Sequence, residues 1–213
     1  MKIAIFTFSL FGINTYVVYD PSTKKCAVVD PGMMLDEEKK AMEDFISRNN
    51  LEVEYIIDTH LHMDHVAGVA FLKEKYHAPL LAHRDDEFWG ENVEAQVRMF
   101  HMRHQLENVK IDRYLEAGDV IKIGEGELKV IHVPGHSPGS VALYDAKDGF
   151  VITGDALFAG SIGRTDLPGG NGPQLIKSIK EGLFPLPDNT VVYPGHGPST
   201  TIGDEKRSNP FLR

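Results

Sequence analysis

The spacing of apolar positions along the chain predicts alternating strands and helices. Two early runs rich in β-branched and aromatic residues, Ile13–Tyr19 and Lys25–Asp30, flank a turn at Asp20-Pro21 and predict a pair of strands. From Leu35 to Asn50 the apolar residues recur about every three to four positions, which predicts an amphipathic helix.

The later part of the chain contains further elements of both kinds. A helix is expected to start at Asp64, whose side chain would cap it, because Val66, Val69 and Leu72 keep helical spacing. The same spacing predicts helices over Val93–Leu106 and Gln174–Gly182. Strands are predicted over Val53–Asp58, Pro79–His83, Val120–Ile123, Leu128–Val133, Ser140–Tyr144, Phe150–Thr153 and Thr190–Tyr193.

The order of these elements favours one α/β domain. Strands bracket helices in both halves, and no low-complexity linker divides the chain, so we predict a single domain over residues 1–213. The apolar start of the chain is interpreted as strands and not as a signal peptide. The reason is that Asn14, Thr15 and Tyr16 occupy the place of the small residues at a cleavage site.

Charge and composition exclude several classes of function. The formal net charge is −9, so no nucleic-acid partner is expected, since phosphate backbones recruit basic surfaces. No window approaches about 18 consecutive apolar residues, so neither a membrane-spanning helix nor a membrane partner is predicted. The single cysteine, Cys26, leaves no internal disulfide and agrees with a cytoplasmic location. The sequence carries no signal for the oligomeric state.

The strongest chemical signal is the motif His60-x-His62-x-Asp64-His65. Residues two apart in extended backbone point to the same side, so His60 and His62 would present their imidazoles to one ion. The chain then turns toward a helix, and Asp64 and His65 would reach a second ion nearby. The motif therefore predicts a metal site, and a merely solvated polar loop is disfavoured.

Three further residues of ligand type follow predicted strands. They are His136 in Pro134-Gly135-His136, Asp155 in Thr153-Gly154-Asp155 and His196 in Pro194-Gly195-His196. Glycines beside them allow the backbone to approach a site closely. Ligands at strand ends of a rigid scaffold are what a preorganised metal site requires.

This pattern, H-x-H-x-D-H followed by a histidine, an aspartate and a histidine, resembles the metallo-β-lactamase superfamily. The resemblance implies an α/β fold, a four-layer αβ/βα sandwich of two mixed β-sheets with helices outside. It also implies two metal sites: His60, His62 and His136 bind the first ion, Asp64, His65 and His196 bind the second, and Asp155 bridges both. Well-known β-lactamases of this fold lack the bridging aspartate, and one group of them uses a cysteine ligand, whereas Cys26 lies far in sequence from the ligand motifs. Antibiotic hydrolysis is therefore disfavoured.

Within the superfamily, the chain is most similar to the glyoxalase II branch (hydroxyacylglutathione hydrolases), especially its short type. The similarity lies in Val29-Asp30-Pro31-Gly32, Gly154-Asp155-Ala156-Leu157-Phe158, Gly163-Arg164-Thr165-Asp166 and Asn209-Pro210-Phe211-Leu212-Arg213. The long enzymes add a helical domain whose basic residues hold glutathione, and they carry a tyrosine where this chain has Pro198. These departures disfavour glutathione as the thiol and leave the hydrolytic centre intact.

The resemblance implies hydrolysis of a small-molecule thioester, such as a 2-hydroxyacyl thiol ester. Two cations about 3.5–4 Å apart lower the pKa of a shared water toward roughly 7, and the resulting hydroxide would attack the thioester carbonyl. We expect two divalent metal ions, zinc first, with iron or manganese as alternatives. The catalytic roles are assigned to Asp64 and Asp155.

Two residues outside the ligand set have competing interpretations. Arg164 would either clamp a substrate carboxylate or pair with Asp166. Asp30 would either form a turn before Pro31 or accept a hydrogen bond from a ligand histidine. We carry Arg164 forward as a substrate-binding residue and Asp30 as a support for the ligands.

A second reaction class stays open. Persulfide dioxygenases also resemble this chain, including the stretch Gly163-Arg164-Thr165-Asp166, and they use one iron. Two histidines and one carboxylate with open positions suit oxygen chemistry at iron. We predict the hydrolase, with an iron-dependent persulfide dioxygenase on the same fold as the alternative.

Overall fold

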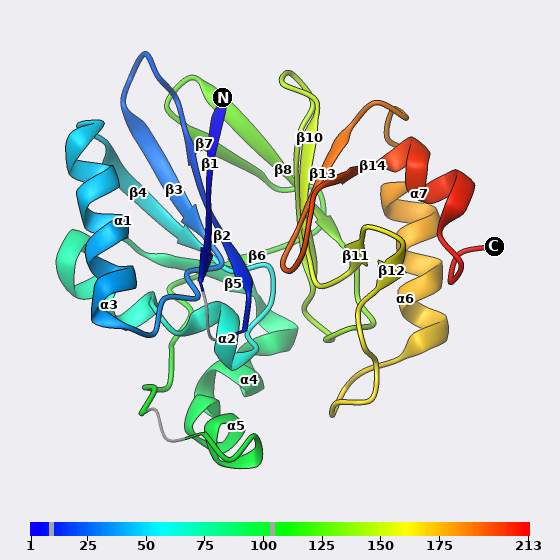
Figure 1. Cartoon of the computed structure of the whole chain (residues 1–213), viewed down its shortest axis with the longest axis horizontal. Helices are drawn as coiled ribbons and strands as arrows, with labels where there is room; N and C mark the ends of the chain where they lie inside the picture. Colours follow the sequence, from blue (N-terminus) through cyan, green and yellow to red (C-terminus); the bar gives the residue numbers. More distant parts are fainter. Residues whose placement is uncertain (9–10, 103–104) are drawn as a thin grey trace.

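Two mixed sheets of six strands each face one another at the centre of the molecule (Figure 1). The computed structural model describes residues 1–8, 11–102 and 105–213. The strands of the first sheet are β1 Lys2–Phe8, β2 Ile13–Tyr19, β3 Lys25–Val29, β4 Glu52–Ile57, β5 Leu80–His83 and β6 Arg113–Leu115. They lie side by side in sequence order, antiparallel from β1 to β3 and parallel from β3 to β6.

The second sheet brings three strand ends to one edge. Its strands are β7 Val120–Ile123, β8 Gly126–His132, β9 Val141–Asp145, β10 Phe150–Gly154, β13 Val191–Pro194 and β14 Thr200–Thr201. Their order is β14-β13-β10-β9-β8-β7, with only the β10–β13 pair parallel. Strands β8, β10 and β13 therefore run in the same direction. A small separate sheet pairs β11 Leu157–Phe158 with β12 Ser161–Ile162.

Helices cover the outer faces of both sheets. The α-helices are α1 Asp36–Arg48, α2 Met63–Val66, α3 Val69–Tyr76, α4 Glu87–Glu91, α5 Val93–Met99, α6 Gly172–Ser178 and α7 Ile202–Ser208. Figure 1 shows α1 and α3 outside the first sheet and α6 and α7 outside the second, with α2, α4 and α5 at one end. The predicted four-layer αβ/βα sandwich is confirmed.

The packing of β2 explains why its sequence reads as an almost continuous apolar run. Ile13 and Val17 lie in the core between the first sheet and its helices, whereas Tyr16 and Val18 lie in the core between the two sheets. A strand covered on both faces needs apolar residues at nearly every position. A third core, which includes Leu175 of α6, joins the second sheet to its helices.

The helix predicted to start at Asp64 differs from the observed helices α2 and α3 in two respects. It begins at Met63, with His62 at the N-cap position and no side-chain cap, so the prediction that Asp64 caps it is wrong. The Asp64 carboxylate is instead directed at His196, with 3.3 Å between Oδ2 and Nε2. The helix is also interrupted at Gly68, whose N–H donates to the Pro31 carbonyl at 2.6 Å, before α3 begins.

The helix predicted over Val93–Leu106 is too long. Helix α5 ends at Met99, and His101 adopts a positive φ of 54°, a left-handed conformation that stops a helix. Leu106 lies in a non-helical segment, and residues 103–104 lie outside the described part of the chain. No helix among the described residues is long and apolar enough to cross a bilayer.

Candidate metal centre

The candidate ligands gather where strands of both sheets end. The loop that follows β4 carries His60 and His62 and leads into α2 with Asp64 and His65. From the second sheet, His136 follows β8, Asp155 follows β10 and His196 follows β13. Because these three strands run in the same direction, their carboxyl ends share one edge of the sheet. The fold thus places all seven candidates at one end of the space between the sheets.

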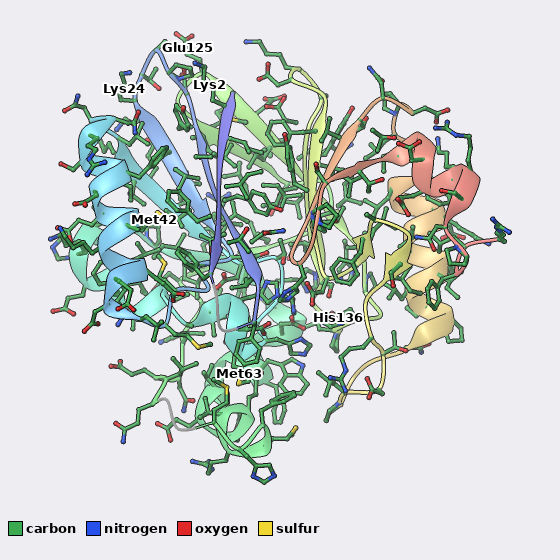
Figure 2. All side chains as sticks on the ribbon, viewed as in Figure 1. Lys2, Lys24, Met42, Met63, Glu125 and His136 are labelled. Carbon is green, nitrogen blue, oxygen red and sulfur yellow. The ribbon has the colours of Figure 1, made fainter. Side chains whose placement is uncertain are left out.

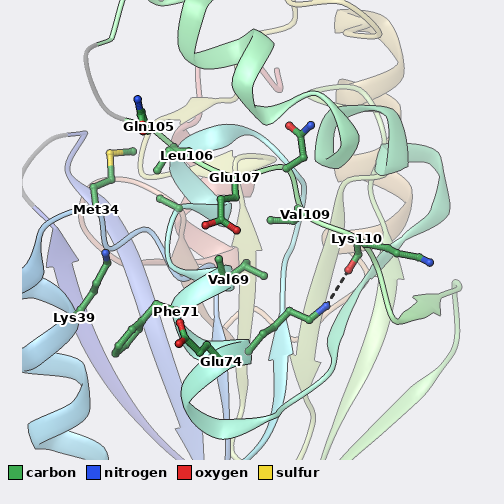
Figure 3. Close-up of a pocket in the computed structure, with 14 residues that line it drawn as sticks. Met34, Lys39, Val69, Phe71, Glu74, Gln105, Leu106, Glu107, Val109 and Lys110 are labelled. Carbon is green, nitrogen blue, oxygen red and sulfur yellow. Dashed lines mark hydrogen bonds between the residues drawn. The ribbon is translucent and has the colours of Figure 1, made fainter.

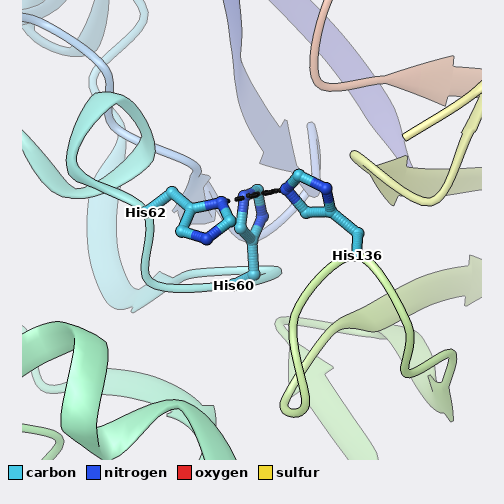
Figure 4. A group of neighbouring side chains, drawn as sticks. All are labelled: His60, His62 and His136. Atoms are coloured by element: carbon cyan, nitrogen blue, oxygen red, sulfur yellow. Dashed lines mark hydrogen bonds between the residues drawn. The ribbon is translucent and has the colours of Figure 1, made fainter. Parts of the chain in front are cut away.

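Three imidazoles form the first group (Figure 4). The Nδ1 atom of His62 lies 2.9 Å from Nε2 of His136, and the same Nε2 lies 3.2 Å from Nε2 of His60. All three residues are almost completely buried. Nitrogens bound to one zinc ion at about 2.0–2.1 Å in tetrahedral geometry lie about 3.4 Å apart, so the group has the spacing of a shared cation.

Asp64, His65 and His196 form the second group. Asp155 lies between the two groups: Oδ1 is 3.4 Å from Nε2 of His65, and Oδ2 is 3.7 Å from both His136 Nε2 and His196 Nε2. A carboxylate that faces histidines of both groups has the position of a bridging ligand. Every predicted metal-ligating residue is therefore brought to one site.

Several atoms of this site are buried without a hydrogen-bond partner among the described residues. They are Nε2 of His62, both ring nitrogens of His65 and Oδ1 of Asp155. Burying a polar atom without a partner is costly, and buried charges are normally paired or coordinate metals. Of these atoms, Nε2 of His65 and Oδ1 of Asp155 face each other at 3.4 Å without forming a hydrogen bond. Nitrogen and oxygen atoms of this kind are donors that divalent transition metals bind, so the residues fit such ions.

The electrostatics of the site also suit a cation. Burial and the imidazole of His136 lower the pKa of His62 to about 3, which leaves its ring neutral and able to coordinate. Burial raises the pKa of Asp155, but the surrounding imidazoles, led by His65, outweigh it and hold that carboxyl ionised. Metal ligands must be deprotonated in this way.

The pKa of His65 is shifted upward, in contrast to that of His62. Burial lowers the pKa of its imidazole, but the carboxylates of Asp30 and Asp155 outweigh burial and hold the pKa well above its ordinary value. The buried carboxylates thus favour positive charge at this position. A bound cation would supply that charge, and metal binding requires a deprotonated imidazole.

Groups behind the ligands fix the orientation of the rings. The carboxylate of Asp30 accepts from Thr59 N at 2.7 Å and Thr59 Oγ1 at 2.8 Å, and its Oδ2 lies 3.2 Å from His65 Nδ1. His136 Nδ1 donates to the Arg164 carbonyl at 2.7 Å, which leaves Nε2 free to face the cluster. Asp30 therefore lies where a support for a ligand histidine would lie.

The ligands Asp155 and His65 pack so closely against Gly195 that no side chain fits at this position. A Cβ atom at this position would lie 2.2 Å from Asp155 Oδ1 and 2.8 Å from His65 Cε1. A side chain there would displace the carboxylate that faces both groups. The glycine in Pro194-Gly195-His196 is thus required by the approach of the chain to the site.

The site opens into a pocket of about 270 Å³. Its lining combines five of the ligands with apolar side chains at the mouth, including Phe11, Phe100 and Leu167. Arg164 also lines the pocket, and its guanidinium forms a bidentate pair with Asp166, with both hydrogen bonds 2.7 Å long. Of the two interpretations of Arg164, the structure shows the pair with Asp166. The paired arginine still lines the pocket.

A larger cavity of about 580 Å³ lies away from these ligands (Figure 3). It is formed by α3 and the segment 105–110, and Lys73 donates across it to the Lys110 carbonyl at 3.2 Å. Its lining mixes lysines, glutamates and apolar residues, and the described lining contains no histidine or aspartate.

Two buried polar side chains at the site were not predicted from the sequence. Asp86, in the 3₁₀ turn Arg84–Asp86, accepts hydrogen bonds from the backbone on both sides of the histidine cluster. Gln96 of α5 accepts from Met63 N at 2.9 Å and donates to the Leu61 carbonyl at 3.2 Å. Neither stands in a recognisable motif. The available signal for Gln96 was a polar residue between apolar positions of a predicted helix, whereas Asp86 lies among other charged residues.

The sequence is similar to several curated proteins over its whole length. An uncharacterized protein of Aquifex aeolicus is 38% identical over 99% of this chain and 97% of its own length. The protein named hydroxyacylglutathione hydrolase GloC of Haemophilus influenzae is 34% identical over 100% of this chain and 98% of its own.

Several solved structures share the fold of this chain and are similar to it in sequence. The B3 metallo-beta-lactamase BLEG-1 is 35% identical, with a TM-score of 0.90 and 99% of each chain covered. TTHA1623, crystallised in a di-iron-bound form, is 36% identical, with a TM-score of 0.86 over 98% of this chain and 100% of that one. ETHE1 from Myxococcus xanthus is 28% identical, with a TM-score of 0.81 over 99% of this chain and 84% of that one.

The family profile described as the Metallo-beta-lactamase superfamily matches residues 9–196, a range that contains all seven candidate ligands. The family predicted from the H-x-H-x-D-H motif is thereby confirmed, as is the fold class. The clustered histidines and aspartates identify an enzyme of the metallo-hydrolase type. This chain belongs to the metallo-β-lactamase superfamily.

Proposed function

We propose that this protein is a dinuclear metal-dependent thioesterase that hydrolyses small 2-hydroxyacyl thioesters. The observation that carries the proposal is the arrangement of two ligand groups around Asp155, whose oxygens face histidines of both. The similarity to the protein named hydroxyacylglutathione hydrolase GloC over the full chain supports the choice of substrate class.

The ligand set suits hydrolysis without a protein nucleophile. When bound, a pair of divalent ions makes a water nucleophilic near neutral pH and polarises a carbonyl oxygen. Asp155 would hold the spacing between the two ion positions, and Asp64, beside His196, would keep a carboxylate facing the pocket. Zinc is our first choice, and iron or manganese the alternatives.

The pocket mouth indicates how a substrate would be held. Phe11 and Phe100 would pack against the apolar part of the substrate and exclude water from the reacting carbonyl. Arg164 would contact an anionic group, and Asp166 would hold its guanidinium in position. We further propose that the protein acts in the cytoplasm as a single domain on small molecules, without nucleic-acid or membrane partners.

An iron-dependent persulfide dioxygenase is the second candidate. It is favoured by the Gly163-Arg164-Thr165-Asp166 stretch, which persulfide dioxygenases also contain. The hydrolase is preferred because both groups of ligands are complete, whereas one iron requires only two histidines and a carboxylate.

The deciding experiment compares metal forms of the purified protein with and without oxygen. Zinc-loaded protein should cleave a 2-hydroxyacyl thioester equally well in air and under nitrogen, because a redox-inert ion supports hydrolysis. A β-lactam serves as the control substrate and should remain intact. Oxygen uptake with a thiol persulfide in the iron form, without thioester cleavage in any metal form, would replace our proposal with the dioxygenase.

A further inference from the structure

The carboxylate of Asp86 lies between the two loops that carry the three-histidine group. Its Oδ2 atom accepts from Leu61 N at 3.1 Å and from Ser137 Oγ at 2.7 Å. Its Oδ1 atom accepts from Gly139 N at 2.6 Å. The side chain is completely buried, so water does not compete for these hydrogen bonds.

Two of these three contacts are next to a ligand in the sequence. Leu61 stands between His60 and His62, whereas Ser137 directly follows His136. One loop comes from the first sheet and the other from the second. The Asp86 carboxylate thus links the backbone at His60 and His62 to the backbone at His136, the three residues of one candidate metal site.

The packing around Asp86 is too close to be incidental. A Cβ atom at Gly139 would lie 2.7 Å from both Cγ and N of Asp86, so only glycine allows the second loop to reach the carboxylate. The Ser137 hydroxyl is held in turn by Ser140 Oγ at 2.8 Å. Gln96 holds the first loop from the other side, through Leu61 O and Met63 N.

We infer that Asp86 is a positioning residue that sets the distance between His136 and the His60–His62 pair, and thereby the metal affinity of the three-histidine site. Supports behind metal ligands of this kind change affinity by about 10–100-fold when they are removed. The inference rests on the metal centre of the proposed function and does not depend on the substrate.

An ionised carboxylate is required because all three partners donate. In Asp86→Asn one oxygen becomes an NH₂ group, and at the Oδ2 position this group would face the N–H of Leu61. Two donors repel, so the loop that carries His60 and His62 would shift. Ser137→Ala is a milder variant, because it removes only one of the three hydrogen bonds.

Asp20 provides a matched control at the other end of the molecule. It is also a buried carboxylate that joins two loops, and it accepts from Ser22 N at 2.9 Å, Thr23 Oγ1 at 2.8 Å and Glu125 N at 2.9 Å. Figure 2 shows Glu125 at the top of the molecule and His136 and Met63 in its lower half. Asp20→Asn should therefore weaken the fold without changing the ligands.

The test uses cobalt(II) as the probe in the full-length protein and each variant. Affinity is measured by competition with a chelator, ligand geometry by the visible absorption bands, and folding by the thermal midpoint. Asp86→Asn should bind one of two cobalt ions about 10–100-fold more weakly with shifted bands. Ser137→Ala should give a smaller change in the same direction, and Asp20→Asn a lower midpoint with unchanged affinity and bands.

Unchanged affinity and bands in Asp86→Asn would overturn the inference, as would an equal loss of affinity in Asp20→Asn. If Asp86→Asn does not fold, Ser137→Ala decides in the same way. A wild-type protein that binds no cobalt would defeat both this inference and the proposed function. Normal cobalt binding without thioester cleavage would defeat only the proposed function.

Discussion

The two carboxylate oxygens of Asp155 face different histidines, and this single residue connects the two ligand groups. Its neighbour in space, Gly195, cannot carry a side chain without displacing it. The properties of the whole centre therefore depend on one carboxylate. That dependence gives a clear expectation for its removal.

Asp155→Ala should lose both metal content and activity. The substitution removes a ligand shared by both ion positions. Removal of a residue that only supports a ligand lowers activity by about 10–100-fold, and turnover in Asp155→Ala should fall further than that. Metal content per chain, measured on the purified variant, should drop below the two ions expected for the wild type. Asp188→Ala is the control, because Asp188 is an exposed carboxylate paired with Lys206. Near-normal turnover in Asp155→Ala would show that the ligand assignment is wrong.

Arg164 and Asp166 form a pair whose two members can be tested separately. If the guanidinium binds an anionic group of the substrate, Arg164→Ala should lower kcat/KM for a carboxylate-bearing thioester more than for a neutral one. Asp166→Ala should preserve this preference for the anionic substrate, because it leaves the positive charge in place. Equal losses for both substrates in Arg164→Ala would point to a purely structural pair.

At the level of helices and strands, α7 is an element that the apolar pattern did not predict. Its sequence, Ile202–Ser208, contains only one apolar residue, so no helical stripe is visible. The helix is instead started by Thr201, whose Oγ1 accepts from Asp204 N at 3.1 Å and donates to Asp204 Oδ2 at 2.7 Å. It is anchored by Glu205, which accepts from Gly160 N at 2.9 Å.

Thr201→Ala should therefore destabilise the protein without affecting the metal centre. Loss of an N-cap side chain costs about 1 kcal/mol of unfolding free energy. Denaturant unfolding of the variant should show this loss, whereas metal content and thioester cleavage should match the wild type. A change in metal content would mean that α7 supports the centre, through Glu205 and the β11–β12 hairpin.

The elements that the sequence predicted well are those whose faces are covered by other elements. Strand β2 matches its predicted range because both of its faces are buried, and α1 matches because Met42 and Ile46 form a buried stripe. The break at Gly68 depends on a contact with a distant segment, the Pro31 carbonyl, and α5 ends where His101 takes a positive φ. Local spacing carries no information on such contacts.

The same distinction applies to the site. The ligands were predictable because a short motif and strand-end glycines mark them in the sequence. Asp86 and Gln96 were not, because their role comes from backbone groups of Leu61, Met63 and Gly139 that approach them only in the folded chain. No spacing rule relates a 3₁₀ turn to a loop on the opposite sheet.

For the molecule as a whole, the candidate centre lies at the junction of the two sheets. His60, His62 and His65 belong to the side of the first sheet, whereas His136, Asp155 and His196 belong to the second. Ions bound between them would join the two halves of the sandwich. Metal binding should consequently contribute to the stability of the entire fold.

Removal of the metal with a chelator should lower the thermal midpoint of the wild-type protein. A ligand that binds only the folded state stabilises it by about 2.7 kcal/mol when its free concentration is 100 times Kd. The midpoint should therefore rise with added zinc and return after the chelated protein is reloaded. Asp155→Ala should show a much smaller shift with zinc, because it lacks the carboxylate between the two groups. A midpoint that does not respond to chelator or zinc in the wild type would mean that the buried histidines and carboxylates hold the two sheets together without an ion.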